Sequence, residues 1–190
     1  TLNTVKNKID DVDIVIVNDF GHGFIFDELI DLVSNKAKFL AVNTQTNSAN
    51  RGFNYISRYP RADYVCIDEP EFRLAAQDKH SDIQQLAENK LNSLIDCKKF
   101  MITLGKKGCV LFENSVKTSE LPAFTNSVVD TVGAGDAFFS VTSPFAMIGA
   151  DNNDLCLLGN IAGALKVEIL GHQKFIEKNK FTKYIETLMK

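Results

Sequence analysis

"DTVGAGDAFF", Asp130 to Phe139, combines a glycine turn, an acid and the start of an apolar, helix-like run. Gly133 and Gly135 permit a tight turn with positive φ and let a ligand approach the backbone closely. A helix that begins at this turn would direct its unpaired N–H groups and the positive end of its dipole at one point. Such a point favours an anion, and phosphate above all.

Asp136 follows this turn directly, so its carboxylate would face any anion bound there. A carboxylate gains nothing from a neighbouring phosphate unless a cation or a proton transfer is involved. Work as a general base, on a hydroxyl that attacks the phosphate, would explain its position. The alternative is that Asp136 only stabilises the helix dipole as an acid of the first turn. The spacing alone leaves both interpretations open.

Around this segment, apolar β-rich runs alternate with helical patterns. Strands are predicted at 13–20, 39–44, 63–69 and 99–105, with a hairpin over 108–121 that turns at Glu113 and Asn114. Helices are predicted at 26–37, 70–78, 81–96, 135–150, 153–170 and 180–190, and the chain opens on the tail of a further helix. This order predicts βαβ units, a mostly parallel sheet and one α/β domain over residues 1–190. Ligands of such sheets bind beyond the carboxyl ends of the strands.

The composition is that of an ordinary globular chain. Of 190 residues, 45% are hydrophobic and 24% charged, and the net charge of −3 gives no basic field for a nucleic-acid partner. No apolar run reaches the roughly 18 residues of a membrane span, and the polar start lacks a signal-peptide core. The four cysteines form no CxxC pair and the three histidines are scattered, which predicts reduced thiols in a cytoplasmic protein without a zinc site.

Four segments together resemble the ribokinase/PfkB family of carbohydrate kinases. "DTVGAGDAF" (130–138) resembles the family's C-terminal signature, and "ITLGKKGCVLF" (102–112) its strand-turn-strand nucleotide element. "NIAGALKVEILG" (160–171) resembles its penultimate helix, and "DYVCIDEPEFRLA" (63–75) lies where the family carries an NxxE motif. The resemblance implies a three-layer ribokinase-like fold with a mostly parallel sheet. It also implies ATP-dependent phosphorylation of a sugar or sugar-phosphate hydroxyl.

The same resemblance implies catalytic roles for the glycine turn. Asp136 would be the base that deprotonates the acceptor hydroxyl. The backbone N–H groups of Gly133, Ala134 and Gly135 would form the anion hole for the transferring γ-phosphoryl group. Positioning and charge neutralisation are what phosphoryl transfer requires most.

Further residues are implied as binding groups. The ATP site would be formed by Thr103, Gly105, Gly108, Asn160, Gly163 and Asn43. Mg²⁺ would be organised by Glu71 and Asp68, and a monovalent cation such as K⁺ by Asp130 and Thr131. Structural alternatives stay open: Gly105 and Gly108 as β-turn glycines, Glu71 as a first-turn acid, Asn160 as a half-buried polar residue and Gly163 as a packing glycine.

Several positions depart from the family pattern. Asp68 stands where NxxE has asparagine. "NDFGHG" (18–23) resembles the "DYGKG" loop of the heptose-phosphate kinases, with His22 in place of lysine. Asn43 and Gln45 stand where those enzymes carry an aspartate and a lysine. A bound phosphate would therefore lose charge-assisted partners, so the acceptor of those kinases cannot be carried over.

The family's glycine-rich N-terminal half and its β lid have no counterpart in the sequence. We therefore expect a C-terminal fragment that lacks much of the sugar pocket, is inactive alone, has the missing N-terminal half as its partner, and forms a homodimer in the full-length protein. Two other functions remain open. One is a non-catalytic nucleotide-binding scaffold within a sugar-nucleotide assembly protein, and the other is a related kinase for a non-sugar alcohol.

Overall fold

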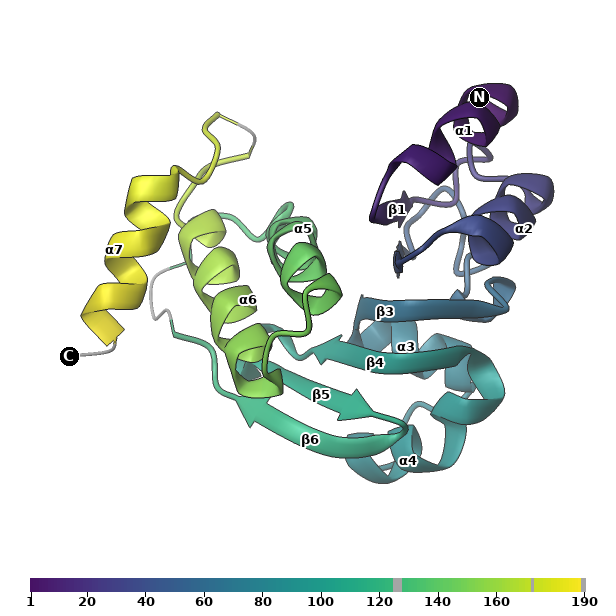
Figure 1. Ribbon diagram of the computed structural model, residues 1–190. Coiled ribbons are helices and arrows are strands. Elements are labelled where there is room, and N and C mark those ends of the chain that lie inside the picture. Colours follow the sequence, from purple (N-terminus) through teal and green to yellow (C-terminus); the bar gives the residue numbers. More distant parts are fainter. Residues whose placement is uncertain (125–127, 172, 189–190) are drawn as a thin grey trace.

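The computed structural model of the chain describes residues 1–124, 128–171 and 173–188 (Figure 1). Its centre is a six-stranded sheet in the order β1-β2-β3-β4-β5-β6. Four strands run parallel: β1 (Val15–Asp19), β2 (Leu40–Thr44), β3 (Arg61–Asp68) and β4 (Asp96–Thr103). The last two, β5 (Cys109–Glu113) and β6 (Val116–Leu121), are antiparallel. The predicted α/β class with a mostly parallel sheet is confirmed.

Helices cover both faces of the sheet, which gives three layers (Figure 1). One face carries α1 (Leu2–Lys8), α2 (Asp27–Lys36), α3 (Glu69–Ala76) and α4 (Ile83–Leu94). The other carries α5 (Ala134–Met147) and α6 (Asn152–Val167), with α7 (Lys178–Leu188) packed on α6. Short 3₁₀ turns lie at Ile9–Asp11, Ile56–Arg58 and Gly105–Lys107. The last predicted helix is confirmed up to Leu188, and residues 189–190 lie outside the described residues.

Strand β3 has an apolar centre, Tyr64 to Ile67, because both faces of the strand are buried. Tyr64 and Cys66 face the α5 side, while Val65 and Ile67 face the α3–α4 side, and all four are buried. The Tyr64 hydroxyl bonds with the Thr142 hydroxyl at 2.8 Å, which satisfies both groups inside the core. Burial on both faces is the usual state of a parallel strand between two helical layers.

The hairpin turn differs from the prediction by one residue. Its central residues are Asn114 and Ser115, with φ of 50° and 62°, rather than Glu113 and Asn114. A two-residue hairpin loop of this kind needs two positive φ values, and asparagine accepts that conformation better than glutamate does. Glu113 therefore remains in β5, opposite Lys99 of β4.

Two further findings concern membrane-spanning helices and cysteine pairing. Within the described residues, no helix is both long and apolar enough to cross a membrane. All four cysteines carry free thiols.

Candidate active site

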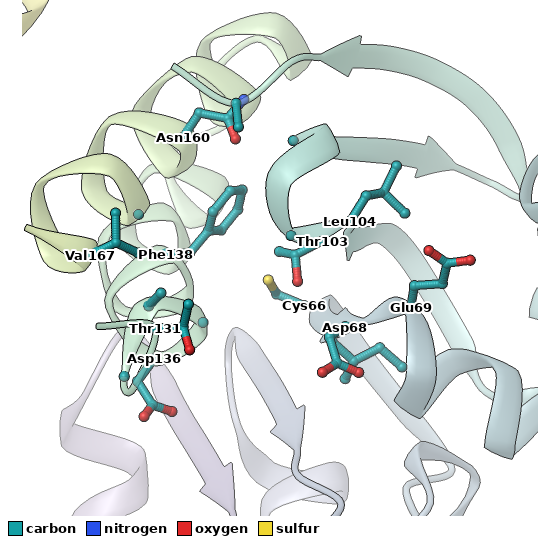
Figure 2. A pocket seen from close by; sticks show the side chains of 18 of the residues that line it. Cys66, Asp68, Glu69, Thr103, Leu104, Thr131, Asp136, Phe138, Asn160 and Val167 are labelled. Atoms are coloured by element: carbon teal, nitrogen blue, oxygen red, sulfur yellow. The ribbon is translucent and has the colours of Figure 1, made fainter. Parts of the chain in front are cut away.

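The carboxyl ends of the parallel strands open into a cavity of about 900 Å³ (Figure 2). Its walls come from the ends of β3 and β4, the turn before β5, the first turn of α5 and one side of α6. Strand register brings Asp68 of β3 level with Thr103 of β4, so residues distant in sequence share one edge. A volume of this size lies at the upper end of the range for small-molecule sites.

Nearly every residue proposed from the sequence lines this one cavity. The lining members of that set are Asn43, Asp68, Glu71, Thr103, Gly105, Gly108, Thr131, Gly133, Ala134, Gly135, Asp136, Asn160 and Gly163. Asp130 is the exception among the proposed residues, since it does not line the cavity. The carboxylate of Asp136 lies at the end of the cavity next to the N-terminal strands, and Asn160 lies at the far end (Figure 2).

The glycine turn takes the predicted position but not all of the predicted geometry. Gly133 caps α5 with φ of 77°, a conformation that favours glycine. Gly135 is already helical, so the expectation of positive φ there is wrong. A side chain at Gly135 would meet no other atom within 4 Å, so the glycine instead leaves open space above the helix start.

The expected anion hole also needs a correction at Ala134. Its N–H donates to the Thr131 carbonyl at 3.2 Å and is therefore engaged within the turn. The first i→i−4 bond of α5 runs from Ala137 N–H to Gly133 O, at 3.0 Å. The amide of Gly135 precedes that bond, so it has no acceptor within the helix and lines the cavity where an anion would bind.

Asp130 has a structural position behind this turn. Its Oδ1 accepts the Val132 N–H at 2.9 Å, and its Oδ2 accepts the Gly171 N–H at 2.8 Å. The carboxylate thus ties the loop before α5 to the turn after α6. Thr131 lines the cavity, whereas Asp130 holds the loop that carries it.

The turn between β4 and β5 depends on Gly108. Its φ of 103° and ψ of −127° are accessible essentially to glycine alone, and a Cβ there would collide with the Leu121 carbonyl. The Leu104 N–H donates to the Gly108 carbonyl at 2.8 Å, which closes the turn. Gly105 also has positive φ, of 58°, but a Cβ there would meet no atom within 4 Å. The turn interpretation therefore holds for Gly108, while Gly105 borders open cavity.

Helix α6 presents two of the proposed residues to the cavity. The Asn160 amide donates to the carbonyls of Pro122 at 3.0 Å and Leu121 at 3.3 Å, so it anchors the segment after β6. A Cβ at Gly163 would meet nothing within 4 Å, so the packing alternative for this glycine is wrong. The glycine that does permit close packing is Gly159, where a Cβ would collide with the Phe138 ring.

Asp68 and Glu71 form a reciprocal cap at the start of α3. The Glu71 N–H donates to Asp68 Oδ1 at 2.8 Å, and the Asp68 N–H donates to Glu71 Oε2 at 2.9 Å. The other Glu71 oxygen accepts the Thr46 N–H at 3.0 Å. Burial, and then the neighbouring Asp68 charge, raise the pKa of Glu71 to about 7. Burial also raises the pKa of Asp68, so the pair retains a proton close to neutral pH.

These carboxylates suit one particular kind of metal site. Among the described residues, which exclude His172, no three His, Cys, Asp or Glu side chains gather into a group that could hold a metal ion. Mg²⁺ is usually bound through one or two carboxylates together with substrate phosphates and water. Asp68 and Glu71 fit that requirement, because both line the cavity and both offer hard oxygen ligands.

Replacing Glu71 with glutamine should flatten the pH dependence of stability. The folded-state pKa of about 7 exceeds the ordinary value of 4.5, so the stabilisation from the protonated carboxyl is fully present below pH 4.5 and is lost as the pH rises through 7. We expect the free energy of unfolding of the wild type to fall by about 1–3 kcal/mol over this interval relative to Glu71→Gln. Urea unfolding at a series of pH values measures it.

Glu69→Gln is the matched control, because Glu69 lies in the same helix turn but pairs with Arg73 at 2.8 Å. Because this variant keeps Glu71, it should retain the wild-type loss of stability over that interval. Parallel stability curves for the wild type and Glu71→Gln would contradict the raised pKa.

The sequence reasoning missed the apolar walls of the cavity. They comprise Cys66, Leu104, Phe124, Val128, Val132, Phe138 and Val167. The alternation of β3 could have placed Cys66, since it faces the same side as Tyr64. The others lie in the turn after β4, in the segments between β6 and α5, and on α5 and α6, and no local pattern predicts that these segments meet.

A known protein family matches this chain in sequence. The sequence model of the pfkB family carbohydrate kinase matches residues 23–179, which is most of the chain. The chain belongs to this family. The predicted resemblance is therefore confirmed.

Similar proteins of this pfkB family include two described as "Bifunctional protein HldE". The chain is 25% identical to that of Shewanella piezotolerans over 90% of its length, and 29% identical to that of Desulfatibacillum aliphaticivorans over 87%. It spans only 35% and 34% of these two relatives, or about a third of their length.

Solved structures of a ribokinase and a phosphofructokinase superpose well on this chain. Ribokinase from Thermotoga maritima gives a TM-score of 0.76 at 21% identity, over 95% of this chain and 59% of the ribokinase. Phosphofructokinase-2 from Escherichia coli, in complex with substrates and products, gives 0.77 at 14% identity, over 99% of this chain and 62% of the enzyme. The fold is thus ribokinase-like, and the chain corresponds to part of those structures.

Proposed function

We propose that this pfkB-family chain carries the phosphoryl-transfer machinery of an ATP-dependent kinase for a sugar or sugar-phosphate hydroxyl. The observation that carries the proposal is the position of Asp136. It lies in the first turn of α5, directly after the Gly133 cap, and shares one cavity with the Asp68–Glu71 pair and the Gly105–Gly108 turn. The residues proposed as base, as anion-binding backbone and as Mg²⁺ ligands thus line one cavity.

In the proposed reaction, the Asp136 carboxylate accepts the proton of the acceptor hydroxyl as its oxygen attacks the γ-phosphorus of ATP. The bond from that phosphorus to the β,γ-bridging oxygen breaks, and ADP leaves. The Gly135 amide and the positive end of α5 stabilise the charge on the transferring phosphoryl group. Mg²⁺ bound with ATP would neutralise phosphate charge, and Asp68 and Glu71 are the residues that would hold it.

The nucleotide would occupy the other end of the cavity. We assign its phosphates to the backbone around Thr103, Gly105 and Gly108, and its base to the surface of α6 beside Gly163. Asn160 supports this surface through its bonds to Leu121 and Pro122. The K⁺ site at Asp130 and Thr131 stays a prediction. The four free thiols suit a cytoplasmic location.

Calorimetry with Mg·ATP, combined with an ADP-release assay, tests this function. The assay uses the full-length protein and a panel of free sugars, sugar phosphates and non-sugar alcohols. We expect micromolar to millimolar nucleotide affinity, about 10⁻⁶–10⁻³ M, and ADP release that depends on a sugar acceptor. Nucleotide binding without turnover of any acceptor would favour the scaffold function, and turnover confined to non-sugar alcohols would favour the third possibility.

We also expect the 190-residue chain to bind nucleotide but not to phosphorylate an acceptor. The reason is that it spans only about three fifths of the ribokinase-like structures. Water exclusion around the acceptor needs walls on all sides of the transferring group. Measurable sugar phosphorylation by the chain alone, in the same ADP-release assay, would contradict this part of the proposal.

A further inference from the structure

The end of the cavity beside Asp136 has a wall of its own, formed where β1 and β2 end. Phe20, Asn43 and Gln45 line the cavity from these two strand ends. Helix α5 packs against β1, and Figure 2 shows the Asp136 carboxylate directed toward the N-terminal strands. An acceptor hydroxyl that gives its proton to Asp136 would therefore lie on the side of the carboxylate that faces this wall. The inference drawn from it rests on the proposed kinase function.

A network of asparagine amides holds this wall in place. The Asn50 amide bridges two carbonyls, that of Gln45 at 2.7 Å and that of Phe20 at 3.2 Å. The Asn47 amide also donates to the Phe20 carbonyl, at 2.7 Å, and the Gln45 N–H donates to the Asp19 carbonyl at 2.8 Å. Phe20 and Gln45 are thus joined through non-local bonds. Such preorganisation is what a recognition surface requires.

Gly21 makes this arrangement possible. Its φ is 65°, and a Cβ there would approach the Asn50 amide nitrogen at 2.6 Å and the Asn54 Cβ at 2.9 Å. The Asn54 amide in turn donates to the Asp19 carbonyl at 2.7 Å. The loop from β1 can therefore lie against the asparagine-rich segment only because residue 21 has no side chain.

The three side chains of this wall, Phe20, Asn43 and Gln45, carry no charge. Phe20 is 38% exposed as a residue, and Gln45 presents a carboxamide that can both donate and accept hydrogen bonds. The Asn43 amide nitrogen is already bound to the Cys66 carbonyl at 2.7 Å. His22 is exposed in the same loop and does not line the cavity.

The charges around the cavity oppose an anion at this end. Among the described lining residues, Lys106 is the one cationic side chain, and it belongs to the β4–β5 turn at the nucleotide end. The carboxylates of Asp68, Glu69, Glu71 and Asp136 also line the cavity. A second phosphate beside Asp136 would find no charge-assisted partner on this wall and would be repelled by the base.

We infer that Phe20 and Gln45 select an uncharged sugar or polyol as acceptor and discriminate against sugar phosphates. The carbon face of the acceptor packs on the Phe20 ring, and its hydroxyls exchange hydrogen bonds with the Gln45 carboxamide. The asparagine network fixes both residues opposite Asp136.

Paired acceptors test this inference in the full-length protein. The kcat/KM of free hexoses and heptoses is compared with that of their terminal monophosphates. We expect the uncharged member to be preferred by about tenfold or more, the size that one charge-assisted contact provides. Gln45→Lys should reverse or reduce this ratio by about tenfold, chiefly through KM, because it supplies the missing cation.

Ser48→Lys is the matched control, since it adds the same charge at an exposed position of the loop that follows Gln45, away from the lining of the cavity. It should leave the ratio unchanged. A wild-type preference for the phosphorylated sugar would overturn the inference, and so would an equal shift of the ratio by both lysine variants.

Calorimetric titration of the same acceptors separates this inference from the proposed function. Uncharged sugars that bind the wild type, bind Gln45→Lys more weakly and are never phosphorylated would support the wall but overturn the kinase. Phosphorylation of sugar phosphates alone would support the kinase but overturn the wall.

Discussion

Asp136→Asn is expected to lower kcat by about 10²–10⁴-fold in the full-length protein, with little change in nucleotide affinity. Asparagine preserves the shape of the side chain at the first turn of α5 but cannot accept the hydroxyl proton. We expect the backbone groups that would bind the phosphates to remain in place, because the Gly133 conformation and the bond from the Ala134 N–H to the Thr131 carbonyl form the turn. Steady-state ADP release and Mg·ATP calorimetry measure the two quantities separately.

Asp154→Asn provides the control for this variant. Asp154 is the first-turn acid of α6, as Asp136 is of α5, and it does not line the cavity. If Asp136 served only the helix dipole, both variants would lose about 0.3–1 kcal/mol of stability and both would keep their activity. We expect that outcome for Asp154→Asn alone. Full activity of Asp136→Asn would show that another group removes the proton.

Gly108→Ala should be the most destabilising of the single glycine-to-alanine changes in the cavity wall, by about 3 kcal/mol or more. The alanine must adopt φ of 103° and ψ of −127° or distort the turn, and its Cβ would collide with the Leu121 backbone, which cannot rotate away. Because the turn joins β4 to β5 at the nucleotide end, ATP affinity should fall along with the midpoint of thermal unfolding. Differential scanning calorimetry and nucleotide titration measure both.

Gly163→Ala is the corresponding control in α6. Its position is helical and open, so the alanine should raise stability by about 0.5–1 kcal/mol through helix propensity. Nucleotide affinity should still decrease, because the new methyl group projects into the space assigned to the base. If Gly108→Ala unfolded at the wild-type temperature, the turn would be more adaptable than its geometry indicates.

The succession of strands and helices along the chain, and the helix start that carries Asp136, were predictable because their signals are local. Buried strands such as β3 appear as continuous apolar runs, and the Gly133 turn marks the start of α5 by composition. The predicted hairpin turn lies one residue too early. Its two positive-φ positions are occupied by Asn114 and Ser115, and this dipeptide is a weaker turn signal than Asn-Gly.

Other parts of the site depend on contacts between distant segments. The bond from the Gly171 N–H to the Asp130 carboxylate could not be inferred from spacing. The Phe20–Gln45 wall depends on amides of the 45–54 loop, which by composition alone is a polar loop. Tertiary hydrogen bonds of this kind determine which lining groups remain available to a ligand.

Transfer of the γ-phosphate itself is the most direct measurement of the proposed function. Full-length protein, Mg·ATP and a free-sugar acceptor are incubated together and followed by ³¹P NMR. We expect a phosphomonoester resonance that grows with ADP, requires the acceptor and is nearly abolished in Asp136→Asn. Saturated nucleotide binding without such a resonance, for every acceptor of the panel, would contradict the assignment of this cavity as a kinase active site.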